Sequence, residues 1–172
     1  VGRFSKEKQF TLLISVFQQL ADSFPNWVLV ILGEGLERKL LLEQIKSFGL
    51  IDRVYLPGQA GNMKQWYESA DLYVLTSSFE GFPNTLVEAM AHGTPAVSFD
   101  CDTGPRDIIR NEVDGMLIPL NNISALKEGL RRLMSDRLLR LRFAEQALGV
   151  RERFSTKRIM NIWDKLFKDV EV

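Results

Sequence analysis

Two acidic residues, Glu80 and Glu88, lie eight positions apart in the stretch TSSFEGFPNTLVEAMAHGTPAVSFD (residues 76–100). The sequence Gly-Phe-Pro-Asn at residues 81–84 is unsuited to the middle of a helix. Proline is tolerated in the first turn of a helix, where its missing N–H would have no partner, so we expect a helix to begin around residues 83–85. The first acid then lies in the loop before the helix, and the second lies about one turn inside it.

The start of this predicted helix is a candidate phosphate site. Its early amides, around Thr85 and Leu86, are expected to lack helical acceptors and to point out of the N-terminus, where the helix dipole is positive. A neighbouring carboxylate would repel a phosphate, but it accepts hydrogen bonds from sugar hydroxyls. A ligand with phosphates in the middle and hydroxylated rings on either side is a nucleotide sugar. The alternative is that Glu88 is a solvated helix residue and Glu80 an ordinary loop acid.

A diphosphate also needs cations, because backbone amides alone rarely neutralise two charges. Arg3 and Lys8 are the candidates, on the predicted loop after a first strand and at the start of the first helix. Arginine offers a planar fork to phosphate oxygens, and lysine offers a point charge. Each could instead be plain surface charge, although a cation at a helix start is mildly unfavourable for the dipole.

Length and composition restrict the class of protein. The chain has 172 residues, 45% hydrophobic and 26% charged, with 22 Lys+Arg and 22 Asp+Glu. This length allows one domain with a real core. The balanced charge argues against broad nucleic-acid binding, which usually shows as a basic excess. A single cysteine cannot form an internal disulfide, and no apolar run reaches the roughly 20 residues that cross a bilayer.

Short apolar runs alternate with helical patterns along the chain. The predicted strands are WVLVILG (27–33), RVYLP (53–57), DLYVLTS (71–77), PAVSF (95–99) and MLIP (116–119). Val1, directly before a Gly-Arg turn, suggests the end of a further strand and a missing N-terminal partner domain. From Asn122 the chain is nearly all helical, with a break near residues 154–155.

This alternation predicts an α/β fold, a Rossmann-like doubly wound parallel sheet of about six strands with helices on both faces and C-terminal helices. Ligands of such sheets bind beyond the carboxyl ends of the strands. The residues with chemical promise fall directly after predicted strands: Arg3, residues 33–35, Gly58, residues 77–80 and residues 100–104.

The stretch FEGFPNTLVEAMAHGTPAVSFD closely resembles the E-x7-E region of retaining glycosyltransferases of the GT-B fold, specifically the large family 4. VGRFSKEK looks like the Gly-Arg…Glu-Lys segment that opens the donor-binding domain of that family. ILGEGLERKLLLEQIKSFGLIDRVYLPGQ is similar to its next unit, and DGMLIP with the helices after it is similar to the end of the domain. The resemblance implies that residues 1–172 are a nucleotide-sugar binding domain, the C-terminal part of a longer two-domain enzyme.

The resemblance also implies a role for each matching residue. Arg3 and Lys8 would hold the diphosphate and stabilise the leaving nucleotide, Glu80 would lie beside the transferred sugar, and these three would be the catalytic residues. Glu88 would bind the ribose hydroxyls. The remaining implied binding residues, which act through backbone amides or a close approach of the chain, are Gly33, Gly35, Gly58, Gly81, Phe82, Asn84, Thr85 and Leu86.

The activity implied by the resemblance is transfer of a hexose or N-acetylhexosamine from a UDP-sugar to a saccharide or lipid-linked acceptor, with retention of configuration. It implies a front-face mechanism, no bound metal and no other cofactor. The acceptor would bind through the missing N-terminal domain, so the isolated domain would be inactive. We expect no nucleic-acid partner and a cytoplasmic protein, with peripheral association of the full protein at the cytoplasmic face of a membrane as one option.

Two departures from the family pattern leave the identity of the sugar open. Pro83 and Asn84 follow Phe82 where many members have Gly-Leu-Pro, and Arg106 stands where an acid is frequent. Two other functions also stay open. A nucleotide-sugar epimerase of the same fold is disfavoured by the lack of further acids and histidines for proton abstraction. A non-catalytic nucleotide-binding or protein-interaction module is the third hypothesis.

Overall fold

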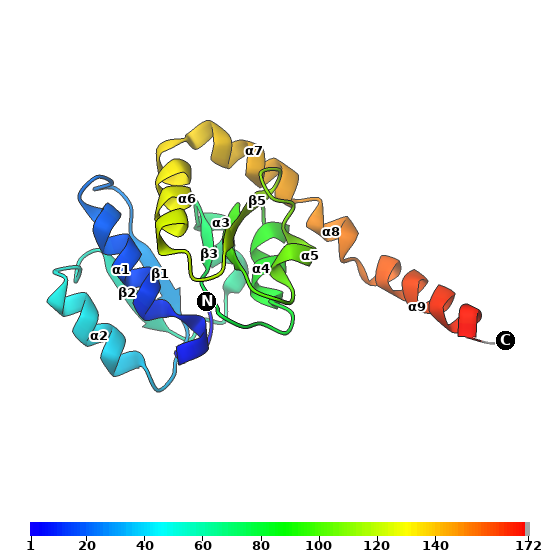
Figure 1. Cartoon of the computed structure of the whole chain (residues 1–172), viewed down its shortest axis with the longest axis horizontal. Coiled ribbons are helices and arrows are strands. Elements are labelled where there is room, and N and C mark those ends of the chain that lie inside the picture. The colour runs from blue at the N-terminus through cyan, green and yellow to red at the C-terminus, as the bar shows by residue number, and fades with distance from the viewer. Residues whose placement is uncertain (171–172) are drawn as a thin grey trace.

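The computed structural model describes residues 1–170, and its parallel strands are connected by helices (Figure 1). The strands are β1 (Leu29–Leu32), β2 (Val54–Gly58), β3 (Tyr73–Leu75), β4 (Ala96–Asp100) and β5 (Gly115–Pro119). Each matches a predicted strand, shortened or shifted by a few residues. The part of the chain that the structure describes therefore has five strands, close to the expected six, because the residues around Val1 form no strand of their own.

Helices fill most of the remaining chain, and the predicted break at residues 154–155 is confirmed as the junction between the last two. The helices are the 3-10 helix η1 (Lys6–Lys8) and the α-helices α1 (Phe10–Ala21), α2 (Arg38–Ser47), α3 (Met63–Ser69), α4 (Asn84–Ala91), α5 (Pro105–Ile108), α6 (Ile123–Ser135), α7 (Arg137–Ala147), α8 (Val150–Arg153) and α9 (Thr156–Val170). Gly93, at φ 78°, follows α4 in the left-handed conformation that closes helices.

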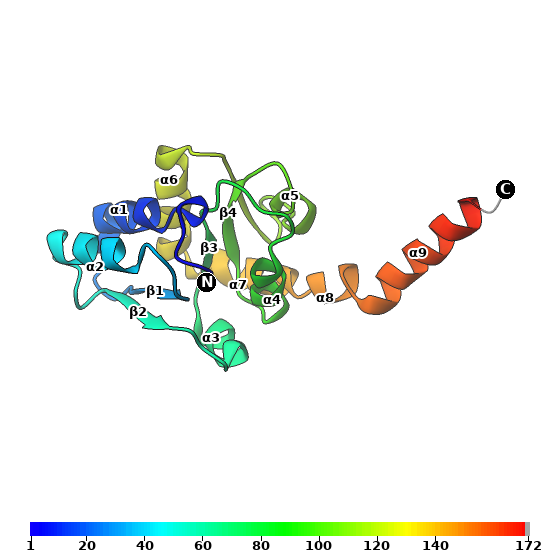
Figure 2. The same ribbon diagram turned by 90° about the horizontal axis from the view of Figure 1, so that it is seen from below.

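Strand β4 buries both of its faces, because successive side chains of a β-strand point to opposite sides and both sides are covered here. In β4, Val97 and Phe99 belong to one apolar cluster with α1, α2 and α6, whereas Ala96 belongs to a second cluster with α3, α4 and α5. Figure 2 shows α1, α2 and α6 on one side of the strands and α3 on the other. The expected placement of helices on both faces is confirmed.

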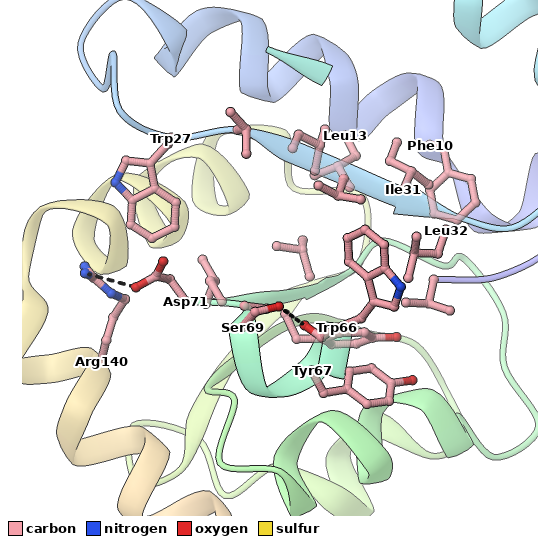
Figure 3. Close-up of a pocket in the computed structure, with 18 of the residues that line it drawn as sticks. Phe10, Leu13, Trp27, Ile31, Leu32, Trp66, Tyr67, Ser69, Asp71 and Arg140 are labelled. Carbon is pink, nitrogen blue, oxygen red and sulfur yellow. Dashed lines mark hydrogen bonds and ion pairs between the residues drawn. The ribbon is translucent and has the colours of Figure 1, made fainter. Parts of the chain in front are cut away.

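The hydrogen-bonded ladder is interrupted between β1 and β3. Strand order is β1-β2 in one part and β3-β4-β5 in the other, all parallel. A cavity of about 440 Å³ separates the two parts, with Leu13, Ile31 and Trp66 among the side chains on its walls (Figure 3). Asp71 and Arg140 approach to 3.8 Å in the lining. The doubly wound layering thus holds, while side chains and space keep the facing edges of β1 and β3 apart.

The first four residues run alongside the end of β1. The amide of Gly2 donates to the carbonyl of Leu32 at 2.9 Å, and that of Phe4 donates to the carbonyl of Glu34 at 2.8 Å. A Cβ at Gly33, where φ is 140°, would lie 1.8 Å from the Gly2 carbonyl oxygen. Glycine at this position therefore permits a backbone contact that any side chain would prevent.

The helix α9 extends away from the rest of the molecule (Figure 1). It exposes an apolar face, on which Met160, Trp163 and Phe167 are between 49% and 60% exposed. Nothing in the helices of residues 1–170 has both the length and the apolar character that a membrane span needs.

The contact at Gly33 makes a stability prediction. We expect Gly33→Ala to lower the free energy of unfolding by about 3 kcal/mol, because the new methyl group overlaps backbone atoms that cannot move aside without breaking the hydrogen bond of Gly2. Chemical denaturation monitored by circular dichroism measures this change. Gly61→Ala is the control, since a Cβ there meets no atom within 4 Å. Equal stability of the two variants would contradict this account.

Candidate functional site

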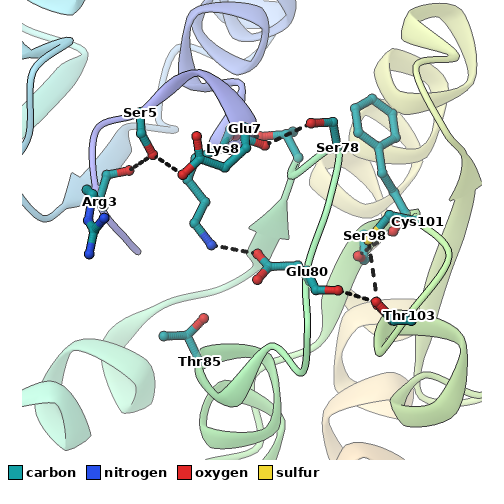
Figure 4. A network of polar contacts seen from close by, with 12 residues as sticks. Arg3, Ser5, Glu7, Lys8, Ser78, Glu80, Thr85, Ser98, Cys101 and Thr103 are labelled. Atoms are coloured by element: carbon teal, nitrogen blue, oxygen red, sulfur yellow. Dashed lines mark hydrogen bonds and ion pairs between the residues drawn. The ribbon is translucent and has the colours of Figure 1, made fainter.

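A polar groove lies where η1 and the loop after β3 meet the start of α4 (Figure 4). Its volume is about 440 Å³. Segments far apart in the sequence form it, and six of the predicted site residues line it. The lining residues are Val1, Gly2, Arg3, Glu7, Lys8, Glu80, Phe82, Pro83, Asn84 and Thr85.

Hydrogen bonds to the backbone carbonyls of η1 hold it over the carboxyl end of β3. The hydroxyl of Thr76 donates to the carbonyl of Lys8 at 2.9 Å. The amide of Ser78 donates to the carbonyl of Glu7 at 2.8 Å. These bonds fix the backbone from which Lys8 extends, so its ammonium reaches the groove from a defined position.

Lys8 and Glu80 form an ion pair across the groove. The Nζ and Oε1 atoms are 2.7 Å apart, and the side chains are 21% and 11% exposed. Thr103, in the loop after β4, donates a hydrogen bond from its hydroxyl to the carbonyl of Glu80. Glu80 is therefore held from two sides, by a cation at its carboxylate and by a hydroxyl at its backbone.

Arg3 is the second cation that lines the groove. Its side chain is exposed, and within residues 1–170 it has no ion-pair partner. Glu7 lies nearby, but its carboxylate already accepts a hydrogen bond from the Ser5 hydroxyl at 2.5 Å, which lowers the pKa of Glu7. The guanidinium of Arg3 is thus available to an anionic ligand.

The start of α4 offers one free amide rather than the two expected. The amide of Leu86 donates to the carbonyl of Pro83 at 2.9 Å, and that of Asn84 donates to the carbonyl of Phe82 at 2.9 Å. Within the described chain, the amide of Thr85 has no acceptor. The prediction for Leu86 was wrong because the turn before the helix closes with short-range bonds that use its amide. The side chain of Leu86 is also fully buried.

Glu88 lies on α4 one turn beyond Thr85. Residues three apart on a helix share a face, so the Glu88 carboxylate lies on the same face of α4 as Thr85, which lines the groove. Glu88 is exposed and is not part of the groove lining. Its Oε2 accepts a hydrogen bond from the hydroxyl of Tyr67 at 2.9 Å. The two acids are thus confirmed on either side of the helix start, each with a partner of its own.

Three predicted glycines lie outside the groove and support it. Gly33 and Gly35 contact the backbone of Gly2 and Phe4, so they fix the segment that carries Arg3. Gly58, at φ 94°, accepts a hydrogen bond from the amide of Gly33 at 2.9 Å. Their observed contacts are with the protein's own backbone.

Gly81 has no such contact. A Cβ there would meet no atom of residues 1–170 within 4 Å. The loop before α4 is instead shaped by Gly104, where a Cβ would lie 2.4 Å from the ring of Pro83. The close packing in this region therefore falls on the loop after β4, where the sequence marked residues 100–104 as candidates without giving Gly104 a role.

Sequence reasoning predicted none of the contacts by which four further polar residues organise the site. They are separated by 21 to 71 positions from the residues they contact. A cluster of small polar residues directly after a buried strand was the available signal for two of them. The four residues are Tyr67, Thr76, Ser78 and Thr103.

The groove combines the two kinds of group that the chemistry of a phosphorylated sugar requires. Cations and a free amide at a helix start suit phosphate oxygens, and carboxylates suit hydroxyls. In residues 1–170 no group of three or more His, Cys, Asp or Glu side chains is arranged to hold a metal ion. The residues able to bind an anionic ligand directly are Arg3, Lys8 and the amide of Thr85.

Comparison with known proteins places the fold in a family. The family described as "Glycosyl transferases group 1" matches residues 1–149. The chain is 37% identical over 169 residues to an exopolysaccharide phosphotransferase of Streptomyces coelicolor, covering 98% of this chain and 18% of that protein. It is 32% identical over 163 residues to an uncharacterized glycosyltransferase of Haemophilus influenzae, covering 95% of this chain and 46% of that protein.

A solved structure agrees with the sequence matches. S. aureus TarM, crystallised in complex with Fondaparinux, alpha-GlcNAc-glycerol and UDP, superposes with a TM-score of 0.90 at 29% identity, covering 96% of this chain and 34% of that chain. The chain spans less than half the length of each of these proteins. It belongs to the group 1 glycosyl transferases, and its fold is that of the C-terminal, Rossmann-like domain of a GT-B glycosyltransferase.

Proposed function

We propose that this domain binds the nucleotide-sugar donor, a UDP-sugar, of a glycosyltransferase. The full protein transfers the sugar, a hexose or N-acetylhexosamine, to a saccharide or lipid-linked acceptor with retention of configuration. The observation that carries the proposal is the groove in which Arg3, Lys8 and the free amide of Thr85 converge beside Glu80. The UDP bound to S. aureus TarM supports uracil as the base.

In this proposal the diphosphate lies against the start of α4. Arg3 and Lys8 approach its oxygens from η1 and the preceding loop, and the amide of Thr85 donates to it from the helix. During transfer the bond between the anomeric carbon and the phosphate oxygen breaks, so negative charge builds on the leaving nucleotide. The two cations stabilise that charge more strongly than they stabilise the ground state.

In this proposal, Lys8 and Glu80 exchange their ion pair for contacts with the donor when it binds. Lys8 turns from the carboxylate to the phosphate when the donor binds. Glu80 then accepts hydrogen bonds from hydroxyls of the transferred sugar, which replace the ammonium at its carboxylate. Glu88, on the far side of the helix start, accepts hydrogen bonds from the ribose.

Retention follows a front-face course in this proposal. The acceptor hydroxyl attacks the anomeric carbon from the side on which the nucleotide leaves, and its proton passes to the departing phosphate oxygen. No covalent sugar–enzyme intermediate forms. The cations of the groove neutralise the diphosphate without a bound metal.

The acceptor binds to a second domain. The curated relatives extend well beyond the span of this chain, which covers 46% of the Haemophilus influenzae protein. The exposed apolar face of α9 supports a further packing partner. The isolated domain therefore binds nucleotide weakly and transfers no sugar. With a lipid-linked acceptor, the full protein works at the cytoplasmic face of a membrane.

Donor binding is tested by titrating UDP into the full-length protein with calorimetry. We expect Arg3→Ala and Glu88→Ala each to weaken UDP binding about tenfold, because each removes a hydrogen-bonding group from the ligand. Lys39→Ala is the matched control, since that side chain is 89% exposed on α2. Absence of UDP binding, or binding indifferent to both site substitutions, would remove the proposal. Binding lost on addition of EDTA would refute the metal-free site.

The charge of Glu80 makes a second prediction. We expect Glu80→Gln to bind UDP about threefold more tightly, because the substitution removes a like charge beside the diphosphate and releases Lys8. The same variant should lose sugar transfer. Parallel calorimetry and turnover measurements on the full-length protein separate the two effects, and weaker UDP binding by Glu80→Gln would contradict the exchange of the ion pair for contacts with the donor.

The stereochemical course is tested on the product. With an α-linked UDP-sugar and an acceptor, we expect an α-linkage, identified from the anomeric proton coupling in the NMR spectrum. A β-linkage would overturn retention. A free epimer formed without acceptor would identify an epimerase, and a protein that binds UDP without any turnover would be a non-catalytic module.

A further inference from the structure

We propose that Tyr67 is a positioning residue that sets the carboxylate of Glu88 for ribose recognition. The inference rests on the proposed function, in which Glu88 binds the ribose of the donor. The hydroxyl of Tyr67, on α3, donates to the Oε2 of Glu88, on α4, at 2.9 Å. The contact joins residues 21 positions apart and ties the exposed acid to a buried ring.

Glu88 needs such a partner because it is exposed on the surface of α4. A free glutamate side chain has several rotamers, and holding one of them for a ligand costs conformational entropy. The hydrogen bond from Tyr67 selects one orientation before the ligand arrives. It uses one carboxylate oxygen as acceptor and leaves Oε1 and a second lone pair for two vicinal hydroxyls.

Tyr67 is itself fixed on several sides. It is 3% exposed, and its ring stacks on His92 with 5.9 Å between centroids and a 16° interplanar angle. The ring of Tyr73 meets it edge-on at 6.3 Å. The hydroxyl of Thr94 donates to the backbone carbonyl of Tyr67 at 2.7 Å. Figure 3 shows Tyr67 on α3, at the margin of the apolar cavity. The phenol is therefore a rigid donor.

The phenol also keeps its proton. Burial, followed by the hydrogen bond to Glu88, raises the pKa of Tyr67 well above its usual range. The hydroxyl thus stays a donor throughout the neutral pH range.

The experiment compares UDP, 2′-deoxy-UDP and pyrophosphate as ligands of the full-length protein. The wild type should prefer UDP over 2′-deoxy-UDP by about tenfold, because an unpaired carboxylate discriminates against the missing hydroxyl. Tyr67→Phe should reduce this preference to about twofold and leave pyrophosphate binding unchanged. Tyr55→Phe is the matched control, since its hydroxyl bonds only the backbone of Asp52 and the side chain is 44% exposed.

A double substitution tests whether Tyr67 acts through Glu88. In the Glu88→Ala background, Tyr67→Phe should have no further effect on the preference for UDP. An additive loss would overturn the proposal, because Tyr67 would then act elsewhere. Equal weakening of all three ligands by Tyr67→Phe would also overturn it, since that result indicates a general structural role.

A measurement on the wild type keeps the proposal testable if Tyr67→Phe does not fold. Carbon-13 relaxation of the glutamate side chains should show Glu88 restricted to one rotamer, in contrast to Glu43, whose side chain is 64% exposed. Free averaging at Glu88 would overturn the inference. If Tyr67→Phe binds UDP normally and still prefers it over 2′-deoxy-UDP as the wild type does, the role of Tyr67 is overturned and the proposed function stands. If the wild type binds no UDP, the role of Tyr67 and the proposed function both fall.

Discussion

Hydrogen bonds between the backbone of the first eight residues and the ends of β1 and β3 determine whether this site exists. Gly2 donates to the carbonyl of the last residue of β1 and Phe4 to a carbonyl just beyond it, and the carbonyls of Glu7 and Lys8 accept from the loop after β3. Arg3 lies between these anchors, so both cations start from a fixed backbone. On an unanchored terminus the same side chains would lose more entropy on binding a ligand, and their contribution to affinity would fall.

The cavity between β1 and β3 and the groove at α4 have the same volume of about 440 Å³ but different linings. The cavity between β1 and β3 has strand edges and aromatic rings for walls, with the ion pair of Asp71 and Arg140 in its lining. The groove at α4 has two cations, two carboxylates and a free amide. Volume alone does not show which of them is the binding site. The polar groups do, because those of the groove at α4 match the phosphates and hydroxyls of a phosphorylated sugar.

Charge balance within the groove restricts the kind of anion it suits. Lys8 already satisfies Glu80 at 2.7 Å, with both side chains mostly withdrawn from solvent. An anion that takes Lys8 without offering donors in return leaves a poorly solvated carboxylate unpaired, which costs free energy. A ligand that carries phosphates and hydroxyls together avoids that cost. The arrangement therefore favours a sugar diphosphate over a simple phosphate.

Local sequence determined the elements and their order. Short apolar runs located the five strands and helical patterns located most of the helices, and Pro83 and Gly93 located the two ends of α4 to within a residue or two. These features depend on neighbours within about four positions, so their physical causes are present in the sequence itself. The two glutamates on either side of a helix start, and the polar residues after strands, followed from the same patterns.

Tertiary structure decided which groups pair across the chain. It directed the amide of Leu86 into the turn and left that of Thr85 free. It brought the backbone of Gly2 so close to residue 33 that only glycine fits there. It also interrupted the hydrogen-bonded ladder between β1 and β3. It also brought Tyr67 to Glu88. Such contacts arise from the packing of whole helices and strands against one another, and no pattern among neighbouring residues specifies them.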